Sequence, residues 1–325
     1  MKAVVCTEHG SPKLLQIDDL PSPELGEGQV RVKVNSVGIN YVEGLMVEGT
    51  YQIVIPPPFV PCSDLAGVVT EVGVAVPNIS VGQKVLVSMG IGAACEEVVV
   101  SADAIIPMPA NMSDAQGAVF LQANATAYFA LVNCGQIKAG ETLLVLGAAG
   151  ATGIAAIQVA KALGARVIAA ASTDDKLRAC RTAGADETIN YSTEDLKTCS
   201  KELTERGVDL VFDPVGGELS ELALRACAPD ARFLIIGFAS GTIPKVPLNL
   251  PLLKRCNIVG VNWGAAAMED PTINPVIFNE LLELFISGKI PCPMVEEFGI
   301  EECAQAFLGV LDRQFVSRPV LKMPI

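Results

Sequence analysis

Three glycines follow a short apolar run near the middle of the 325-residue chain. The run covers residues 143–146, the glycines are Gly147, Gly150 and Gly153, and a helical pattern then extends to Gly164. An unbroken apolar run is typical of a strand buried in a parallel sheet. Glycines between such a strand and a helix let the backbone approach a pyrophosphate, which the free N–H groups of the helix N-terminus bind. The pattern predicts a dinucleotide site; the alternative is a glycine-rich turn without a ligand.

The residues after the next strand, 166–171, indicate which dinucleotide binds. An acid at this place binds the ribose 2′-hydroxyl of NAD, whereas a cation suits the 2′-phosphate of NADP. Here Ser172 follows the strand, and Lys176 lies at the start of the next helix. Asp174 and Asp175 would oppose a phosphate, and we interpret them as first-turn acids stabilised by the helix dipole. The pattern favours NADPH; the alternative for Lys176 is a solvated surface lysine.

The elements that position these residues alternate in the second part of the chain. Strands are expected near residues 142–147, 166–171, 187–189, 208–213, 231–236 and 257–262, with helices near 151–163, 174–183, 193–204 and 217–226. Strand–helix alternation predicts a doubly wound parallel sheet. The first 120 residues are expected to be mostly β, with short strands near 3–6, 29–37, 68–72 and 97–100, and with a turn at Gly82 that leads into a strand within 81–87. Short strands at this spacing predict a partly open barrel.

Further helices and one strand complete the expected organisation. Ser113 is expected to open a helix, because it forms a capping box with Gln116. A second helical stretch is expected over about 125–132. Two more helices are expected near 275–287 and 301–311, and the strand over 318–322 follows them. Because the sheet is complete by then, the last segments are expected to return to the first domain. The predicted domains are therefore residues 1–122 with 266–325, for the substrate, and residues 123–265, for the dinucleotide.

Composition argues against several classes of function. The chain has 23 Lys and Arg against 36 Asp and Glu, a net charge of −13, and no basic cluster, which argues against nucleic acids and anionic membrane surfaces. Residues 142–160 carry no charge, but their clustered Gly and Thr favour a buried strand and helix over a membrane span. The N-terminus does not resemble a signal peptide, and the ten cysteines contain no C-x-x-C pair. We therefore expect reduced thiols and a cytoplasmic protein.

Ligands for a zinc ion are scarce in this sequence. Zinc sites need three or four Cys, His or carboxylate ligands. His9 is the one histidine, in an expected surface loop, and no four-cysteine segment exists. We expect no metal.

With these pieces in place, the chain resembles, over nearly its whole length, the zinc-independent quinone oxidoreductases of the medium-chain dehydrogenase/reductase superfamily, the zeta-crystallin-like group. Residues 38–43 (Gly-Ile-Asn-Tyr-Val-Glu) resemble the family's G-V-N-x-x-D, residues 49–51 its G-x-Y, residues 56–61 its proline-rich stretch, and residues 148–153 its A-A-G-G-V-G. Residues 213–217 (Asp-Pro-Val-Gly-Gly) and 237–241 are similar to two further signatures. The resemblance implies an α/β protein with a Rossmann domain and a GroES-like barrel.

The resemblance also implies roles for single residues. Asn40, Tyr51, Thr126 and Trp263 would lie near the nicotinamide and the substrate, with Asn40 and Tyr51 as catalytic candidates. The cofactor would be held by Ala149, Gly150, Ala151, Thr152 and Gly153, by Ser172, Lys176 and Tyr191 at its adenosine phosphate end, and by Phe238 and Ser240, which would cover it. Homodimers would form through edge strands of the nucleotide domains. Asn40 is similar in position to a zinc-binding cysteine of the alcohol dehydrogenases, which fits the loss of metal.

Each of three site residues also has a purely structural interpretation. Tyr51 could pack against the proline stretch, Asn40 could cap a turn, and Thr126 could bond to its own helix backbone.

Residues 61–67 depart from the family pattern P-G-x-E-x-A-G. This chain has Cys62 in place of the glycine and Asp64 in place of the glutamate. Cys62 is either a reactive thiol near the substrate or a packed small side chain, and the change leaves the substrate preference open.

The activity that follows is transfer of hydride from NADPH to a quinone. Negative charge then builds on the acceptor's carbonyl oxygen, and hydrogen-bond donors aimed at that oxygen stabilise the transition state. Asn40 and Tyr51 are the candidate donors. The alternatives are reduction of an α,β-unsaturated ketone, aldehyde or thioester, and a cofactor-binding protein with little turnover.

Overall fold

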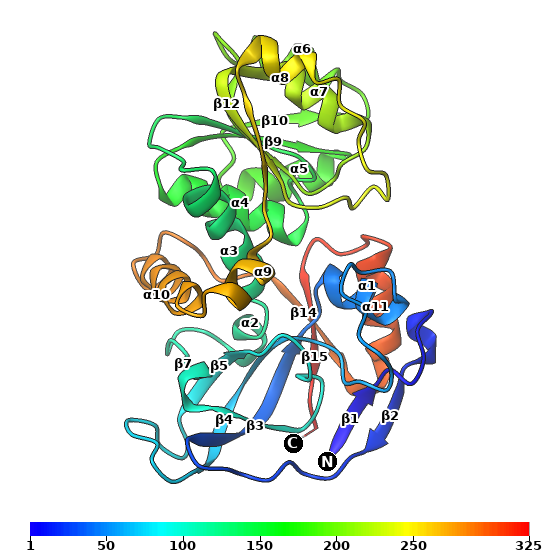
Figure 1. Cartoon of the computed structure of the whole chain (residues 1–325), viewed down its shortest axis with the longest axis vertical. Helices are drawn as coiled ribbons and strands as arrows, with labels where there is room; N and C mark the ends of the chain where they lie inside the picture. The colour runs from blue at the N-terminus through cyan, green and yellow to red at the C-terminus, as the bar shows by residue number, and fades with distance from the viewer. Residues whose placement is uncertain (325) are drawn as a thin grey trace. The chain divides into compact units, whose positions relative to one another are not determined.

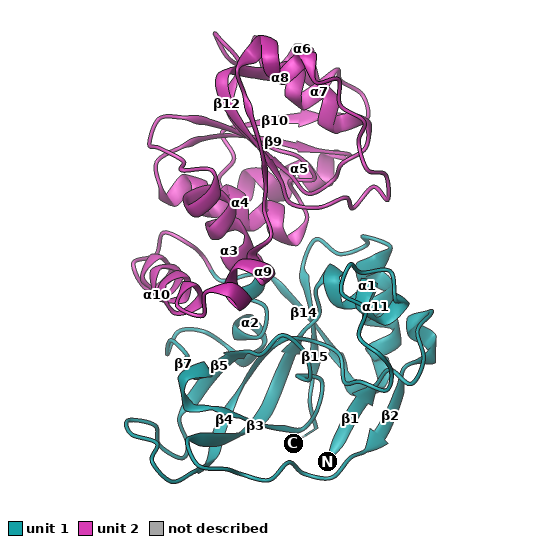
Figure 2. Cartoon of the chain, in the orientation of Figure 1, with its two compact units in different colours: residues 1–122, 292–325 teal, residues 123–291 magenta. Residues whose placement is uncertain are grey.

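The computed structural model describes residues 1–324, which divide into two compact units (Figure 2). Unit 1 comprises Met1–Gln122 and Cys292–Ile325, and unit 2 comprises Ala123–Pro291. The first boundary falls at the expected place, whereas residues 266–291 belong to unit 2 instead of returning to unit 1. Over the described residues, no helix is long and apolar enough to cross a membrane.

Unit 2 alternates strands and helices as the sequence predicts. Its strands are β8 (Thr142–Val145), β9 (Arg166–Ala171), β10 (Glu187–Asn190), β11 (Val208–Asp213), β12 (Cys227–Ile235) and β13 (Asn257–Gly260). Its helices are α4 (Ala151–Ala162), α5 (Asp174–Thr182), α6 (Leu196–Glu202), α7 (Glu218–Ala226), α8 (Asn249–Lys254), α9 (Trp263–Glu269) and α10 (Ile273–Ile286). Before them, α3 (Leu121–Tyr128) is followed by a π-helical segment, Phe129–Cys134, where the sequence predicted one helix over 125–132.

The six strands of unit 2 are parallel, in the order β10-β9-β8-β11-β12-β13. The apolar side chains of the inner strands β8, β9 and β11 are buried, as in Leu143, Leu144 and Val145, whereas Ile258 of the edge strand β13 is 40% exposed. Figure 1 shows α4 on one side of this sheet and α6 and α7 on the other. The chain runs outward from β8 to one edge and then returns to β11, so the order reverses between these two strands. In such doubly wound sheets, ligands bind beyond the carboxyl ends of the strands at this reversal.

Helices α9 and α10 are held together by the side chains of Trp263, Asn274 and Phe278. The indole N–H of Trp263 donates to Asn274 Oδ1 at 2.9 Å, and its ring meets that of Phe278 edge to face, with centroids 6.3 Å apart. Burial raises the pKa of Tyr128 in α3, and the charge of Glu280 in α10 raises it further. Helix α10 therefore packs on α9, and its Glu280 lies close enough to α3 to act on Tyr128, which agrees with the grouping of residues 266–291 in unit 2.

Unit 1 is mostly β, as predicted. Its strands are β1 (Lys2–Val5), β2 (Gln16–Asp19), β3 (Gln29–Gly38), β4 (Asp64–Val72), β5 (Lys84–Ser88), β6 (Glu97–Ser101), β7 (Ile106–Pro107), β14 (Val295–Gly299) and β15 (Arg318–Lys322). Its helices are α1 (Tyr41–Glu48), α2 (Asp114–Gly117) and α11 (Cys303–Leu311), with 3₁₀ turns at Pro12–Leu14, Ala102–Ala104 and Ile300–Glu302. The sequence analysis did not predict α1, which is short and contains Gly44, or β14, whose residues do not alternate.

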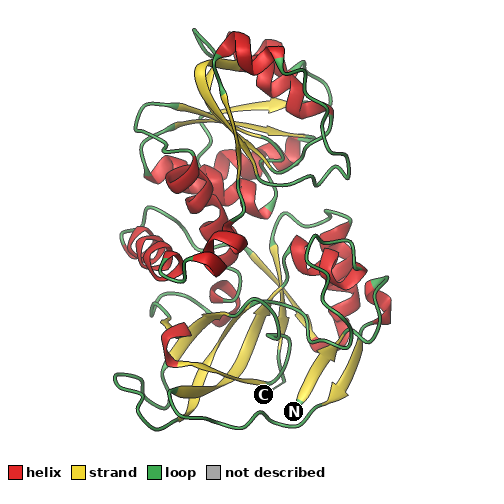
Figure 3. Ribbon diagram, in the orientation of Figure 1, coloured by secondary structure: helices red, strands yellow, loops and turns green. Residues whose placement is uncertain are grey.

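Strand β3 is the centre of unit 1. It pairs antiparallel with β4 along most of its length, and with β6 and β15 along two separate parts of it, in a sheet of order β14-β15-β3-β4-β5-β7. Two register shifts against β4 bend the pair, and a Cβ at Gly67 would lie 2.2 Å from the carbonyl oxygen of Lys33. The bend therefore needs glycine at this position. Figure 3 shows the curved strands of this unit, which form the expected partly open barrel.

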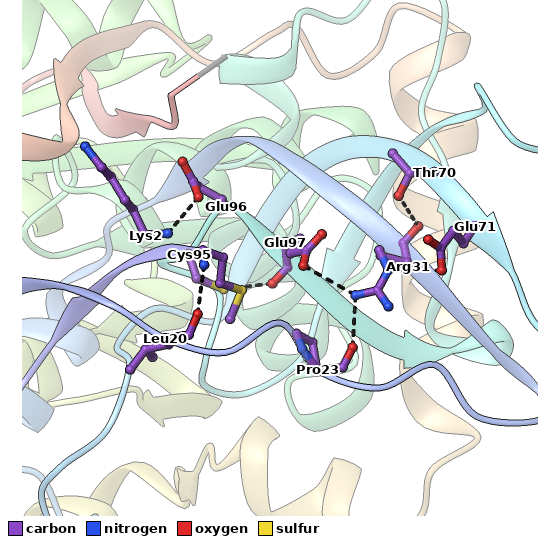
Figure 4. A network of polar contacts seen from close by, with 10 residues as sticks. Lys2, Leu20, Pro23, Arg31, Thr70, Glu71, Cys95, Glu96 and Glu97 are labelled. Atoms are coloured by element: carbon purple, nitrogen blue, oxygen red, sulfur yellow. Dashed lines mark hydrogen bonds and ion pairs between the residues drawn. The ribbon is translucent and has the colours of Figure 1, made fainter.

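Arg31 of β3 links its neighbouring strands on the outside of the sheet (Figure 4). Its guanidinium lies 3.2 Å from a carboxylate oxygen of Glu71 and 3.4 Å from one of Glu97, and it donates to the carbonyl oxygen of Pro23 at 3.0 Å. These contacts connect β3, β4 and β6 with the loop before β3.

Asp64, at the start of β4, is a buried acid with an exposed fraction of 1%. One of its carboxylate oxygens accepts the backbone N–H of Gln122 at 2.9 Å. Burial raises the pKa of Asp64 to about 7, and the charge of Glu43 adds to the rise, while Ser88, Gln122 and Arg318 oppose it. Near neutral pH a substantial part of the folded protein therefore carries a proton on this carboxyl.

We predict that Asp64→Asn removes a pH-dependent cost of folding. An unfolded aspartate titrates near 3.8 and the folded Asp64 near 7, so between these values only the folded protein holds the proton. The Asp64 contribution to the free energy of unfolding therefore falls as the pH rises through this window. Asn resembles the protonated acid, so the variant should match the wild type near pH 4 and exceed it by up to about 4 kcal/mol near pH 8.

Urea unfolding from pH 4 to pH 8 measures this difference. Asp114→Asn is the control, since Asp114 lies at a more exposed position and pairs with Lys84 at 3.1 Å; it should follow the wild-type profile. A stability difference between Asp64→Asn and wild type that stays constant with pH would contradict the prediction.

Candidate cofactor and active site

The turn after β8 brings bare backbone to the carboxyl end of the sheet. Gly147 has a φ of 55°, and a Cβ on it would lie 2.7 Å from a methyl carbon of Val215. Gly150 is the N-cap of α4 and no side chain caps the helix. A Cβ at Gly153 would lie 2.6 Å from the carbonyl oxygen of Ala148. Positions 147 and 153 therefore admit only glycine, because the side chain of Val215 and the backbone of Ala148 lie too close for a Cβ atom.

The first turn of α4 can bind an anion. The first N–H groups of a helix have no intrahelical partner, and they carry a partial positive charge. Here they belong to Ala151, Thr152 and Gly153; Gly150 before them is exposed, Ala151 and Thr152 are half-buried, and Ala149 is buried. A helix N-terminus of this kind, without a side-chain cap, fits a phosphate.

Ser172, Lys176 and Tyr191 lie close together beyond β9 and β10. The backbone N–H of Tyr191 donates to the carbonyl oxygen of Ala171 at 3.2 Å, and the hydroxyl of Ser192 donates to that of Ser172 at 3.0 Å. Lys176 lies in the first turn of α5, where its backbone N–H donates a hydrogen bond to Oγ1 of the N-cap residue Thr173. In the described part of the chain, the Lys176 ammonium forms no ion pair.

The two aspartates beside Lys176 are engaged elsewhere. Asp174 accepts a hydrogen bond from the side-chain amide of Asn190 at 3.0 Å, and Asp175 pairs with Arg178. Both lie in the first turn of α5, as expected. No acid follows β9 directly, because Ser172 and Thr173 occupy that place.

The Asp-Pro-Val-Gly-Gly segment forms the turn after β11. Asp213 is buried, and its Oδ1 accepts the backbone N–H groups of Val215 at 2.8 Å and Gly216 at 2.9 Å. Gly216 and Gly217 have φ of 71° and 64°, a conformation that favours glycine. The conformation of this turn therefore strongly favours glycine at both positions.

Phe238 and Ser240 lie on the loop after β12, which docks on this turn. The backbone N–H of Ser240 donates to the carbonyl oxygen of Val215 at 2.8 Å, and a Cβ at Gly216 would lie 2.9 Å from a ring carbon of Phe238. Since Val215 also contacts Gly147, this loop, the turn after β11 and the glycine turn lie side by side.

Asn40 and Tyr51 lie in unit 1, around the buried carboxylate of Glu43. Glu43 Oε2 accepts the backbone N–H of Asn40 at 2.8 Å, and Oε1 accepts the hydroxyl of Ser63 at 2.7 Å and, at 3.4 Å, the side-chain amide of Asn40. Asn40 Oδ1 accepts a hydrogen bond from Arg318 at 2.9 Å. Burial raises the pKa of Glu43, and these hydrogen bonds lower it in part.

Tyr51 is half-buried on the loop after α1. Burial raises the pKa of its hydroxyl, and the negative charge of Glu43 raises it further. The hydroxyl therefore keeps its proton at neutral pH, and among residues 1–324 it has no hydrogen-bond partner. Tyr51 can thus donate a hydrogen bond to a ligand, as Asn40 can with its amide.

Cys62 is a packed side chain, which agrees with the second of the two interpretations. It is 1% exposed, and burial raises the pKa of its thiol well above the usual value, with Glu43 adding to the rise. A thiol that does not ionise is a poor nucleophile. Its φ of 70° lies in the left-handed region, which explains why the family pattern has glycine here.

The donors present do not fit a zinc ion. Within residues 1–324, no three His, Cys, Asp or Glu side chains gather in a way that could hold a metal. Asn40, at the place implied for a zinc-binding cysteine, contacts the guanidinium of Arg318, which would repel a metal cation. His9 is half-buried, not on the open surface as expected; its ring tilts against Phe59 with centroids 6.0 Å apart.

Thr126 and Trp263 lie in unit 2, in α3 and at the start of α9. Both are half-buried. The polar N–H of Trp263 is occupied by Asn274, so its indole ring is the part available to a ligand.

Arg318 and Ser63 are polar site residues that the sequence analysis did not single out, and Asp64 was noted only as a departure from the family pattern. The Asn-x-x-Glu spacing of residues 40–43 is a capping pattern and could have indicated the Asn40–Glu43 bond. Nothing near Arg318 in the sequence indicates Asn40, which lies 278 positions away.

Comparison with known proteins identifies the family. The model of the zinc-binding dehydrogenases matches residues 151–278, and that of the alcohol dehydrogenase GroES-like domain matches residues 26–110. Quinone oxidoreductase-like protein 2 homolog from Nematostella vectensis is 36% identical over 324 residues, which cover 98% of this chain and 88% of that protein. Prostaglandin reductase-3 from Mus musculus is 36% identical over 224 residues, 69% of this chain and 59% of that protein.

A solved structure agrees over the whole chain. The quinone oxidoreductase from Thermus thermophilus, known also in complex with NADPH, has 32% sequence identity and a TM-score of 0.86, and the match covers 99% of this chain and 100% of that one. The predicted Rossmann and GroES-like fold is confirmed, and members of this family bind NADPH. The chain belongs to the quinone oxidoreductase family of the medium-chain dehydrogenase/reductase superfamily.

Proposed function

We propose that this protein is an NADPH-dependent, zinc-independent oxidoreductase that reduces a quinone. One observation carries the proposal: the bare glycine turn at Gly147–Gly153 is joined, beyond β9, by Ser172 and an unpaired Lys176 where an NAD-specific site would carry an acid. Backbone amides suit the pyrophosphate, and the lysine suits the 2′-phosphate. The similarity to the quinone oxidoreductase from Thermus thermophilus, known in complex with NADPH, supports the same cofactor and acceptor.

The residues of unit 1 have a role in charge stabilisation. Bound NADPH supplies a hydride, and reduction of a quinone to a hydroquinone also takes up one proton. Negative charge develops on the acceptor's carbonyl oxygen, and the Asn40 amide and the Tyr51 hydroxyl are donors that stabilise it. Because the pKa of Tyr51 is raised, the hydroxyl is protonated and able to donate at neutral pH. The proton can come from Tyr51 or from water.

The second candidate activity is reduction of an α,β-unsaturated ketone, aldehyde or thioester. The similarity to prostaglandin reductase-3 favours it. An enone also develops negative charge on its carbonyl oxygen, so the same donors serve both acceptors. Binding of NADPH with little turnover is the third possibility.

Absorbance loss of NADPH at a fixed enzyme concentration separates these activities. Protein dialysed against a chelator is mixed with a panel of simple quinones and enones. We expect turnover with quinones and no gain on adding zinc, since the site does not fit the metal. Turnover with enones alone supports the second activity, tight NADPH binding without oxidation supports the third, and a rate that needs zinc contradicts zinc independence.

Lys176→Ala should weaken NADPH far more than NADH. A charge-assisted hydrogen bond to phosphate contributes about 1.5–3 kcal/mol, so NADPH affinity should fall about 10- to 100-fold, while NADH affinity stays within about twofold. Fluorescence titration measures both. Lys161→Ala is the control, because Lys161 pairs with Asp186 at 2.8 Å away from this site. Equal losses for both cofactors would show that Lys176 does not meet the extra phosphate.

We also propose a cytoplasmic homodimer. All ten cysteines are unpaired, which supports a reducing compartment. Strand β13 is an edge strand, and Leu252 and Leu253 of the neighbouring α8 are 76% and 74% exposed. An apolar surface beside a free edge favours a protein partner, here a second copy.

Light scattering should give twice the chain's 34.0 kDa. The double variant Leu252→Glu, Leu253→Glu should shift the mass toward the monomer. Val74→Glu, at a position of unit 1 that is 77% exposed, should leave the dimer intact. A monomeric wild type at micromolar concentration argues against the assembly.

A further inference from the structure

The side-chain amide of Asn40 lies between the guanidinium of Arg318 and the carboxyl group of Glu43. Its Oδ1 accepts a hydrogen bond from Arg318 Nη2 at 2.9 Å, and its Nδ2 lies 3.4 Å from Glu43 Oε1. A guanidinium can only donate hydrogen bonds, and both carboxyl oxygens of Glu43 act as acceptors, Oε2 for the backbone N–H of Asn40 and Oε1 for the hydroxyl of Ser63. The partners therefore permit one orientation of the amide, with the oxygen toward Arg318 and the nitrogen toward Glu43.

The backbone places Arg318 beside Asn40. Strand β15 runs antiparallel to β3, with Val320 opposite Gly38, and the N–H of Ile39 donates to the carbonyl oxygen of Pro319 at 3.1 Å. Continuing this register by two residues sets Arg318 opposite Asn40. The contact is therefore a product of strand pairing, between residues 278 positions apart.

Asn40 is the one hydrogen-bond partner of the Arg318 side chain within residues 1–324. Burial lowers the pKa of Arg318 to about 10, while Asp64 and Glu43 raise it, so the guanidinium is charged at neutral pH and lies near both acids. Arg31 differs, because it contacts two carboxylates and a backbone carbonyl on the outside of the sheet. The Arg318 side chain is thus directed at an amide and not at an acid.

We propose that Arg318 is a positioning residue, which fixes the Asn40 amide so that its nitrogen, and not its oxygen, is offered to the carbonyl oxygen of the acceptor. The inference rests on the proposed function, in which Asn40 donates to that oxygen. An amide has two N–H groups, and Glu43 occupies one of them. An amide turned over would present its oxygen, which repels the developing negative charge.

The test is a double-mutant cycle on the full-length protein with NADPH and a quinone. Arg318→Met keeps the length of the side chain and removes the donors; it should lower kcat about 10- to 100-fold and leave the KM for NADPH within about twofold. Asn40→Ala should lower kcat by a similar factor. If Arg318 acts through Asn40, the double variant should be no slower than Asn40→Ala alone, within about twofold.

Two further variants separate positioning from folding. Arg318→Lys keeps the charge and can donate one bond, so it should recover part of the loss. Arg31→Met is the matched control: it removes the guanidinium of another part-buried arginine of unit 1, and should leave kcat unchanged even if the protein is less stable. If circular dichroism shows that Arg318→Met is unfolded, Arg318→Lys replaces it in the cycle, with an expected loss of about 3- to 10-fold that disappears in the Asn40→Ala background.

Three results would overturn the inference: a kcat within twofold of wild type for folded Arg318→Met, losses that multiply in the double variant, or full activity of Asn40→Ala. Each of them is measured on a wild type that turns over the quinone. A wild type that reduces neither quinones nor enones instead overturns the proposed function itself, and the positioning role with it.

Discussion

The close approach of α4 to the end of β8 is the constraint on which unit 2 depends. A Cβ at Gly153 would lie 2.6 Å from the carbonyl oxygen of Ala148, so any side chain would push the helix away from the strand. The same absence of side chains leaves the amides of the first helical turn open to an anion. Packing of the helix on the sheet and binding of a phosphate therefore require the same residue types. Gly147 likewise has no side chain, and this allows Val215 of the neighbouring turn to pack against it.

Unit 1 is organised by a different constraint, which is the accommodation of buried charge. Glu43 and Asp64 are both 1% exposed, and an isolated buried carboxylate is costly. The structure offsets this cost in two ways. Glu43 accepts several hydrogen bonds, while Asp64 retains its proton up to a pH of about 7. Arg318 lies near both acids and supplies the compensating positive charge.

The sequence predicts unit 2 well because its signals are local. Apolar runs, helical spacing and glycine positions all act within about 30 residues, and the strands appear where these patterns place them. The charge of the site beyond β9 is also predicted from local sequence, because Lys176 and the absence of an acid at the strand end both lie within a few residues of β9. Residues 266–291 were misplaced because the side chains that hold α10, such as Trp263, have no periodic signal.

The candidate site in unit 1 could be predicted only in part. Asn40 and Tyr51 were indicated by resemblance; in the fold Asn40 is hydrogen-bonded to Glu43, and Tyr51 lies within reach of its charge. Arg318 could not be found, because its place beside Asn40 results from the pairing of β3 with β15 across 278 positions. The left-handed backbone of Cys62 has no signal in its residue type, since cysteine rarely adopts this conformation.

The residue type at position 40 is determined by its neighbours as much as by a ligand. An aspartate there would add a third carboxylate to Glu43 and Asp64 around one guanidinium. A leucine would leave both Arg318 and Glu43 without their bonds to this side chain, at the cost of unsatisfied buried charge. An amide satisfies a donor on one side and an acceptor on the other. Because the guanidinium withdraws electron density from the amide oxygen, it also makes the opposite N–H groups stronger donors. In the proposed mechanism, the guanidinium of Arg318 thus strengthens the hydrogen bond from the Asn40 amide to the acceptor oxygen. This bond would stabilise the negative charge in a site whose donors do not fit a metal ion.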